Sequence, residues 1–249
     1  MRFGVMSAMP EELAAVLEDL TLRDVVETGG RRFHVGTLAG RDAVLVSSRM
    51  GKVAAAVTAT MLLDRFACDA IVFTGVAGGA APEVRVGDVV IGERLIQHDL
   101  DASPIFPRYQ VPLLGVSTFE ADGELSARAA AAAEALSARA SELLGPEAKK
   151  LGIDRPRVHR GLIASGDKFF ASAEAIAELR ARLPEILAVE MEGAAVAQVA
   201  HEHDAPFAVI RTISDTADHA APVDFARFVA AAPGPYARAI VHAVIAPAS

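Results

Sequence analysis

The chain has 249 residues, of which 52% are hydrophobic and 22% charged, so it has enough apolar material for a large core. Its formal net charge of -8 argues against the basic surface on which nucleic-acid binding and acidic-membrane binding depend. The single cysteine, Cys68, forms no internal disulfide, and we expect a cytoplasmic protein without a signal peptide or a membrane span.

Short apolar runs, most of them with β-branched residues, predict strands at 2–8, 43–48, 70–76, 88–91, 161–165, 186–189 and 206–213. Patterns typical of helices lie at 51–66, 121–144, 172–181, 193–203, 224–232 and 236–244. This alternation predicts an α/β fold in a single domain over 1–249, with a central mixed sheet flanked by helices. The charged, proline-containing stretch 145–158 is predicted to be a surface connection within that domain.

Pro10, Glu11 and Glu12 directly follow the first predicted strand. A proline at the first helical position, followed by acidic residues, is typical of a helix start. The same place is the carboxyl end of a strand, where open α/β folds bind their ligands. Glu12 is therefore a candidate base as well as a helix-start residue.

Residues 74–80 (TGVAGGA) follow another predicted strand. The segment has neither the dinucleotide-binding fingerprint nor the lysine of a phosphate-binding loop. Its glycines, Gly78 among them, suit a tight turn after the strand. They equally suit the close approach of a flat or anionic ligand to the backbone, and the pattern leaves both interpretations open.

Glu190 and Glu192 flank Met191 where a further apolar run gives way to a helix. An acidic helix start is one interpretation, because carboxylates interact favourably with the helix dipole. Recognition of a sugar is the other, because an ionised carboxylate accepts hydrogen bonds from a pair of hydroxyl groups such as those of ribose.

The run at 206–213 carries Arg211 and is followed by Ser214 and Asp215. A buried arginine is costly unless it is paired, so we expect Arg211 to face a carboxylate, and a structural ion pair would satisfy it. Asp215 is a candidate general acid with a pKa raised by apolar surroundings. Phe169 and Phe170, after the run 161–165, are either core anchors or a surface on which a base stacks. No spacing of His, Cys or Asp matches a metal site.

Taken together and in order, these motifs resemble the 5′-methylthioadenosine/S-adenosylhomocysteine nucleosidases of the purine nucleoside phosphorylase superfamily. The segments that carry the resemblance are 8–12 (AMPEE), 51–56 (GKVAAA), 74–79 (TGVAGG), 86–89 (VGDV), 165–167 (SGD), 189–192 (VEME) and 213–215 (ISD). The resemblance implies a nucleoside phosphorylase-like fold and a cytoplasmic homodimer that acts without a cofactor in methionine salvage. The implied reaction is hydrolysis of the N-glycosidic bond of 5′-methylthioadenosine or S-adenosylhomocysteine, which releases adenine.

By that resemblance, Glu12 activates the attacking water, with help from Arg211, and Asp215 protonates the purine at N7. These roles agree with the chemistry, because in glycoside cleavage positive charge develops on the sugar and negative charge on the departing base. The residues that contact the substrate, by the same resemblance, are Glu192 and Met191 at the sugar, Phe169 at the base, and Arg211, Gly78 and Ser214.

Val76 stands where similar proteins often have a hydroxyl residue, and 102–115 differs from better-known members in the region that shapes the 5′ pocket. The connection 138–158 is also longer than usual. A phosphorylase or a futalosine-type hydrolase on the same fold is the alternative enzyme, because a fold does not fix its substrate. A phosphate nucleophile needs several converging donors, for which Arg49 is the best further candidate. A nucleoside-binding protein without catalysis is the alternative from another class.

Overall fold

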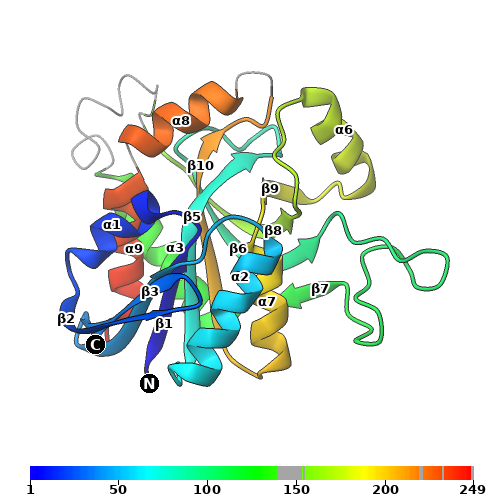
Figure 1. Ribbon diagram of the computed structural model, residues 1–249. Coiled ribbons are helices and arrows are strands. Elements are labelled where there is room, and N and C mark those ends of the chain that lie inside the picture. The colour runs from blue at the N-terminus through cyan, green and yellow to red at the C-terminus, as the bar shows by residue number, and fades with distance from the viewer. Residues whose placement is uncertain (140–152, 154, 219–220, 232, 248–249) are drawn as a thin grey trace.

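Strands and helices alternate along the computed structural model, which describes residues 1–139, 153, 155–218, 221–231 and 233–247 (Figure 1). The strands are β1 (Phe3–Ser7), β2 (Thr21–Thr28), β3 (Arg31–Leu38), β4 (Arg41–Ser47), β5 (Ala70–Gly79), β6 (Val89–Gln97), β7 (Thr118–Glu120), β8 (Val158–Ser165), β9 (Ile186–Glu190) and β10 (Phe207–Asp215). The helices are α1 (Pro10–Leu17), α2 (Lys52–Thr60) with its π-helical continuation η1 (Met61–Arg65), α3 (Gly123–Ser137), α6 (Ala173–Arg182), α7 (Gly193–Glu202), α8 (Ala221–Ala231) and α9 (Pro233–Ile245). The predicted α/β class with a central mixed sheet and flanking helices is confirmed.

Five of the strands close into a ring. β5 pairs with β10, β10 with β6, β6 with β8, β8 with β9, and β9 pairs back with β5. From β5 the sheet also continues outward through β1, β4, β3 and β2. Four adjacent strands, in the order β4, β1, β5 and β10, are parallel to one another, so their carboxyl ends lie along one edge. β9 is antiparallel to β5 but pairs with it only at Gly78 and Gly79, so the carboxyl ends of both strands meet.

Alternate residues of the strands contribute to two hydrophobic clusters on opposite faces of the sheet. Val5 and Val72 belong to one cluster, and their neighbours Met6 and Phe73 belong to the other, as the two-residue period of a strand requires. Buried residues of α1, α3 and α9 complete the first cluster, and those of α2 and α7 complete the second. Because helices cover both faces, the carboxyl edge of the sheet is where a ligand can reach the strand ends.

The strands β2 and β3 form a hairpin that the apolar runs do not predict. β2 is largely exposed and rich in charged residues, so no apolar run marks it. The loops Gly29-Gly30 and Ala39-Gly40 connect β2 to β3 and β3 to β4, and all four residues have positive φ, as type I′ turns require. The Gly-Gly pair between two extended segments is the sequence signal that could have revealed the hairpin.

Several predicted elements have different ends in the structure, as three examples show. The apolar run predicts a strand at 88–91, whereas β6 continues to Gln97 through a register shift between Gly92 and Arg94 that accommodates polar residues. The helix predicted at 51–66 changes from α-helical to π-helical geometry after Thr60. The helix predicted at 121–144 begins at Gly123, and residues 140–144, like most of the predicted connection 145–158, lie outside the described residues.

Candidate active site

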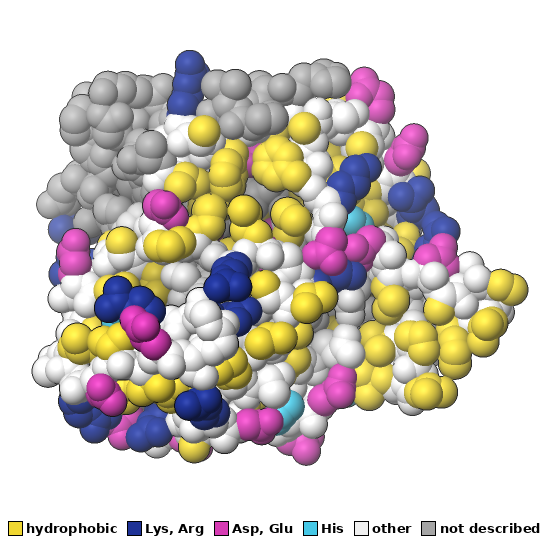
Figure 2. All heavy atoms as spheres, in the orientation of Figure 1, with side chains coloured by type: hydrophobic (Ala, Val, Ile, Leu, Met, Phe, Trp, Pro, Cys, Tyr) yellow, Lys and Arg dark blue, Asp and Glu magenta, His cyan; other side chains and the backbone are white. Residues whose placement is uncertain are grey.

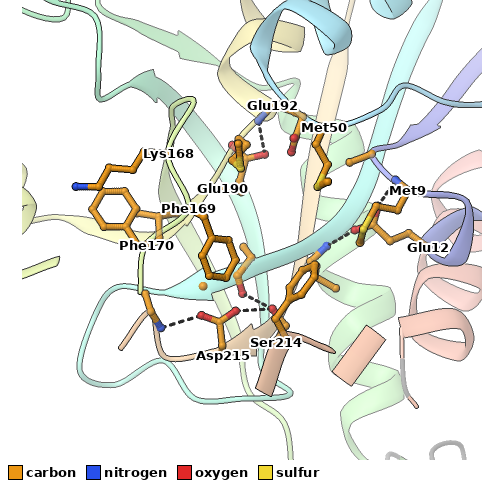
Figure 3. Close-up of a pocket in the computed structure, with 18 residues that line it drawn as sticks. Met9, Glu12, Met50, Lys168, Phe169, Phe170, Glu190, Glu192, Ser214 and Asp215 are labelled. Atoms are coloured by element: carbon orange, nitrogen blue, oxygen red, sulfur yellow. Dashed lines mark hydrogen bonds between the residues drawn. The ribbon is translucent and has the colours of Figure 1, made fainter. Parts of the chain in front are cut away.

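A cavity of about 400 Å³ lies at the edge where β1, β5, β9 and β10 end (Figure 3). Its wall includes ten of the residues singled out from the sequence, namely Glu12, Val76, Gly78, Phe169, Phe170, Glu190, Met191, Glu192, Ser214 and Asp215. These residues come from separate segments of the chain. The pairing of β5 with β1, β9 and β10 brings the segments together, because the four strands end at the same edge.

Glu12 is a buried carboxylate held by backbone donors. It is only 2% exposed, and its oxygens accept hydrogen bonds from the N–H groups of Met9, at 2.8 Å, and Val76, at 2.9 Å. Burial raises the pKa of Glu12, although these bonds and the nearby charge of Arg211 oppose the rise. A Cβ on Gly75 would lie 2.8 Å from Glu12 Oε1, so the glycine leaves room for the carboxylate. This environment suits a group that takes up a proton.

Asp215 is the second buried carboxyl group of the cavity. Its Oδ2 accepts a hydrogen bond from the Ser214 hydroxyl, and its Oδ1 accepts one from the Ala217 N–H, both at 2.8 Å. Burial raises the pKa of Asp215, against the effect of these two bonds. A carboxyl group with a raised pKa keeps its proton closer to neutral pH, as a general acid must. A Cβ on Gly78 would lie 3.0 Å from Asp215 Oδ1, so this glycine gives the carboxyl group space.

Arg211 forms an ion pair behind the cavity wall. The prediction that it faces a carboxylate is confirmed, because its Nη2 lies 2.5 Å from Glu190 Oε2, and the two side chains are 1% and 2% exposed. Its guanidinium carbon also lies 4.0 Å from the centroid of the Phe73 ring. Arg211 is not among the described residues of the cavity wall, and its expected contact with the substrate stays a prediction.

Glu190 has its acceptor capacity filled by the protein. Besides Arg211, it accepts hydrogen bonds from the Ser165 hydroxyl and from the N–H groups of Glu192, at 3.2 Å, and Gly193, at 2.7 Å. Its carboxylate thereby holds the start of α7 against the ends of β8 and β10. Of the two acidic residues beside Met191, Glu190 is the one explained by structure alone.

Glu192 has unused acceptor capacity and faces the cavity. One oxygen, Oε1, accepts a hydrogen bond of 2.7 Å from the N–H of Gly51, and no other partner is found among the described residues. Burial, followed by the repulsion of Glu190, raises the pKa of Glu192 to about 8. Hydroxyl donors from a ligand would favour its ionised form, so the site is suited to bind a diol.

An aromatic wall lies on the side of the cavity nearest Asp215 (Figure 3). Phe169 is 45% exposed, and its ring makes an edge contact with that of Phe225, with centroids 5.8 Å apart. Phe225 comes from α8, and no sequence motif marks it. Met9 and Met50 also line the cavity without having been assigned, although each follows a strand inside or beside a quoted motif. Position directly after a strand is the signal that could have found both methionines.

Two motifs that carry no assigned chemistry, 51–56 and 165–167, meet Asp99 in one polar network beside the cavity. Lys52 Nζ lies 2.6 Å from Asp99 Oδ1, and the Lys52 N–H donates to Asp167 Oδ1 at 2.9 Å. The Asp167 N–H in turn donates to Asp99 Oδ2 at 2.9 Å. The network ties the loop that carries Phe169 to the start of α2, where Gly51 holds Glu192.

Within the described part of the chain, no group of three His, Cys, Asp or Glu side chains is arranged to hold a metal ion. The buried Cys68 lies in the hydrophobic core, and burial raises its pKa to about 12, so the thiol stays protonated. None of the described helices has the length and apolar character needed to cross a membrane.

A strand ring flanked by helices, with buried carboxyl groups gathered around a cavity at the strand ends, is typical of a nucleoside phosphorylase-like α/β protein. Residues 2–246 match the sequence family described as the phosphorylase superfamily. The chain belongs to that superfamily and, within it, to the family of the 5′-methylthioadenosine/S-adenosylhomocysteine nucleosidases.

Solved structures of that family, and one of a futalosine hydrolase, overlay nearly the whole chain. The Neisseria meningitidis 5′-methylthioadenosine/S-adenosylhomocysteine nucleosidase, in complex with methylthio-immucillin-A, is 37% identical, with a TM-score of 0.85 and coverage of 98% of both chains. The Streptococcus pneumoniae enzyme with a transition-state inhibitor is also 37% identical, with a TM-score of 0.83 and the same coverage. A futalosine hydrolase mutant of Helicobacter pylori is 29% identical, with a TM-score of 0.83 and coverage of 98% of both chains.

Proposed function

We propose that the protein hydrolyses the N-glycosidic bond of a purine nucleoside, 5′-methylthioadenosine or S-adenosylhomocysteine, and releases adenine. Four buried carboxyl groups lie in the cavity wall, and Glu190 is paired with Arg211, so the observation that carries the proposal is the set of the other three, Glu12, Glu192 and Asp215. Each has a raised pKa caused first by burial, and each occupies a different side of the cavity (Figure 3). Family membership supports the same reaction.

Asp215 acts as the general acid at the purine. Asp215 lies near Phe169, whose exposed ring provides a surface for stacking a purine (Figure 3). In this pose the carboxyl proton of Asp215 goes to N7 of the purine as the bond to the sugar breaks. The bond Asp215 accepts from Ser214 orients the carboxyl group and leaves its proton available to the ligand.

The two glutamates act at the sugar. Glu192 accepts hydrogen bonds from the ribose hydroxyls, with Met191 packed beside the ring. Glu12 takes a proton from a water molecule that attacks the anomeric carbon. The oxygen of water forms the new bond to that carbon, and the electron pair of the broken bond leaves with the protonated base.

Water is favoured over phosphate as the nucleophile because the cavity wall is poor in cationic donors. Lys168 is the one Lys or Arg among the described wall residues, and its Nζ lies 5.0 Å from the centroid of the Phe170 ring. Arg211 is already neutralised by Glu190. Val76 contributes no hydroxyl, and its N–H donates to Glu12. A dianionic phosphate would meet the Glu12 carboxylate without compensation.

Product analysis in phosphate-free buffer, repeated with added phosphate, tests the reaction. We expect free adenine and a free ribose analogue at a rate that does not depend on phosphate. A sugar phosphate among the products would show that the protein is a phosphorylase. Absence of adenine release from any purine nucleoside would support the alternative of a nucleoside-binding protein.

We further propose that the protein is a cytoplasmic homodimer that serves methionine salvage. The segment between β6 and β7 projects from the molecule, and Figure 2 shows it rich in hydrophobic side chains. Ile105 and Leu113 in this segment are 82% and 94% exposed, and Val53 on α2 is 76% exposed. Apolar surface of this kind favours association. Light scattering after size-exclusion chromatography should give twice the chain mass, and Leu113→Asp should shift it toward the monomer.

A further inference from the structure

A second cavity, of about 530 Å³, adjoins the first, and Ala8, Met9 and Met50 line both. All of its ionisable side chains are basic, and no Asp or Glu is found among its described wall residues. We call it the arginine cavity, after a wall that contains Arg31, Arg32, His34 and Arg49. In a chain with a formal net charge of -8, such a local excess of positive charge is a binding surface for an anion.

Arg31 is a buried cation without an acidic partner. Its residue is 9% exposed, and its Nη1 and Nη2 donate to the carbonyl groups of Gly29, at 2.8 Å, and Ala54, at 3.2 Å. Its Nε has no hydrogen-bond partner in the described structure. Carbonyl groups orient the guanidinium but leave its charge uncompensated. Burial, followed by repulsion from Arg49, lowers the pKa of Arg31.

Arg49 is held near Arg31 by an unusual backbone. Its φ is 75°, in the left-handed region that favours glycine, and its Nη2 donates to the Gly30 carbonyl at 2.7 Å. A Cβ on Gly30 would lie 2.5 Å from that nitrogen, so the glycine makes the contact possible. Strain of this kind persists where the surroundings enforce it and is frequent at ligand sites. Two like charges brought together in this way would both gain from a shared anion.

The position of the arginine cavity indicates which part of a nucleoside would reach it. Figure 3 shows Met9 and Met50 across the cavity from Asp215 and Phe169. With the base at Phe169 and the ribose hydroxyls at Glu192, as the proposed function has it, a substituent on the 5′ carbon extends past the two methionines. We propose that the arginine cavity binds a carboxylate at the end of that 5′ substituent, through Arg31 and Arg49. This inference rests on the proposed function and specifies its substrate class.

The test compares two substrates that differ in charge but not in carbon number, 5′-(3-carboxypropylthio)adenosine and 5′-butylthioadenosine. We expect wild-type kcat/KM to favour the carboxylate by roughly tenfold or more, the usual effect of a charge-assisted hydrogen bond. Arg49→Gly should abolish the preference, and it should fold, because glycine adopts a φ of 75° without strain. Arg65→Gln, which removes an exposed charge bonded to Thr28 outside the cavity, should keep the preference.

Three results would overturn the inference. One is an equal loss of preference in Arg65→Gln, which would indicate general charge attraction. Another is a wild-type enzyme that cleaves both substrates alike. The third is inhibition by inorganic phosphate that disappears in Arg49→Gly without any difference between the substrates, which would identify free phosphate as the occupant. If neither substrate releases adenine, the proposed function fails. Calorimetric binding of the two 5′-substituted adenosines to the wild type and to Arg49→Gly then still tests the arginine cavity.

Discussion

The β9–α7 junction holds two buried carboxylates that differ in how far protein donors fill their hydrogen-bonding capacity. On the side facing β10, Glu190 is paired with Arg211 and accepts further hydrogen bonds from Ser165 and Gly193. On the side facing the cavity, Glu192 is buried with one backbone donor, that of Gly51. The residues are two positions apart in the chain and have the same side chain, so their different roles come from their partners alone.

A buried carboxylate whose hydrogen-bonding capacity is filled by protein donors is costly for the fold to lose. One with spare capacity lowers the stability of the fold until a ligand binds it. Glu190 is of the first kind, and Glu192, Glu12 and Asp215 are of the second, because burial raises the pKa of each. We therefore expect substitution of Glu190 to affect mainly folding, and substitution of Glu192 or Asp215 to affect mainly activity.

The largest effect is expected at Asp215. Asp215→Asn keeps the size of the side chain but removes the transferable proton, so kcat should fall by roughly 10²–10⁴-fold. Binding of an unreactive nucleoside analogue, measured by calorimetry, should be retained. Turnover close to that of the wild type would assign the acid role to another group.

Glu190→Gln should mainly affect stability. The substitution leaves the buried Arg211 charge unpaired, which costs about 3–5 kcal/mol of unfolding free energy. Denaturant unfolding measures the loss. Glu185→Gln is the matched control, since it breaks the more exposed pair with Arg94 and should cost under about 1 kcal/mol. Equal losses in the two variants would contradict the structural role of Glu190.

Glu192→Gln should mainly affect activity. An amide is a weaker acceptor for ribose hydroxyls than a carboxylate, so kcat/KM should fall by roughly tenfold or more. A 2′-deoxy substrate should lose a similar factor on the unaltered protein. Equal reactivity of the deoxy and ribo substrates would refute the assignment of Glu192 to the sugar.

The same variant should change the pH dependence of stability. Because the pKa of Glu192 rises from 4.5 to about 8 on folding, the folded protein binds more protons than the unfolded chain between these values. Stability from this group therefore falls as pH rises through that range. Glu192→Gln removes the effect, so its Tm relative to wild type should increase from pH 5 to pH 8. A Tm difference that is constant with pH would show that Glu192 is ionised throughout.

The smallest effect is expected at Lys52, which begins α2 and lies outside the β9–α7 junction. Lys52→Met breaks the partly exposed contact with Asp99, so the loop carrying Phe169 is held less firmly. We expect KM to rise by a few-fold with little change in kcat, in keeping with the modest energy of such a pair. Lys52→Arg should restore much of the loss, and a drop in kcat alone would contradict a positioning role.

Strand ends were the part of the site that sequence patterns could locate. Glu12, Glu192 and Asp215 each directly follow an apolar run, and strands end where α/β folds bind ligands. Phe225 could not be found in this way, because it reaches the cavity from a helix whose apolar pattern serves the core equally well. The β2–β3 hairpin was missed because β2 is exposed, and with it the turn that carries Gly29 and Gly30.

Hydrophobic periodicity and residue type are local properties, and they were enough to predict most of the strands and helices, the α/β class and the segments whose carboxylates meet. The tertiary structure was needed to show that Arg211 pairs with Glu190, while Glu192 keeps a free acceptor. It also decided that Arg31 and Arg49 converge without an acid. Charge pairing depends on distances between segments far apart in the chain, and those distances follow from strand register and packing.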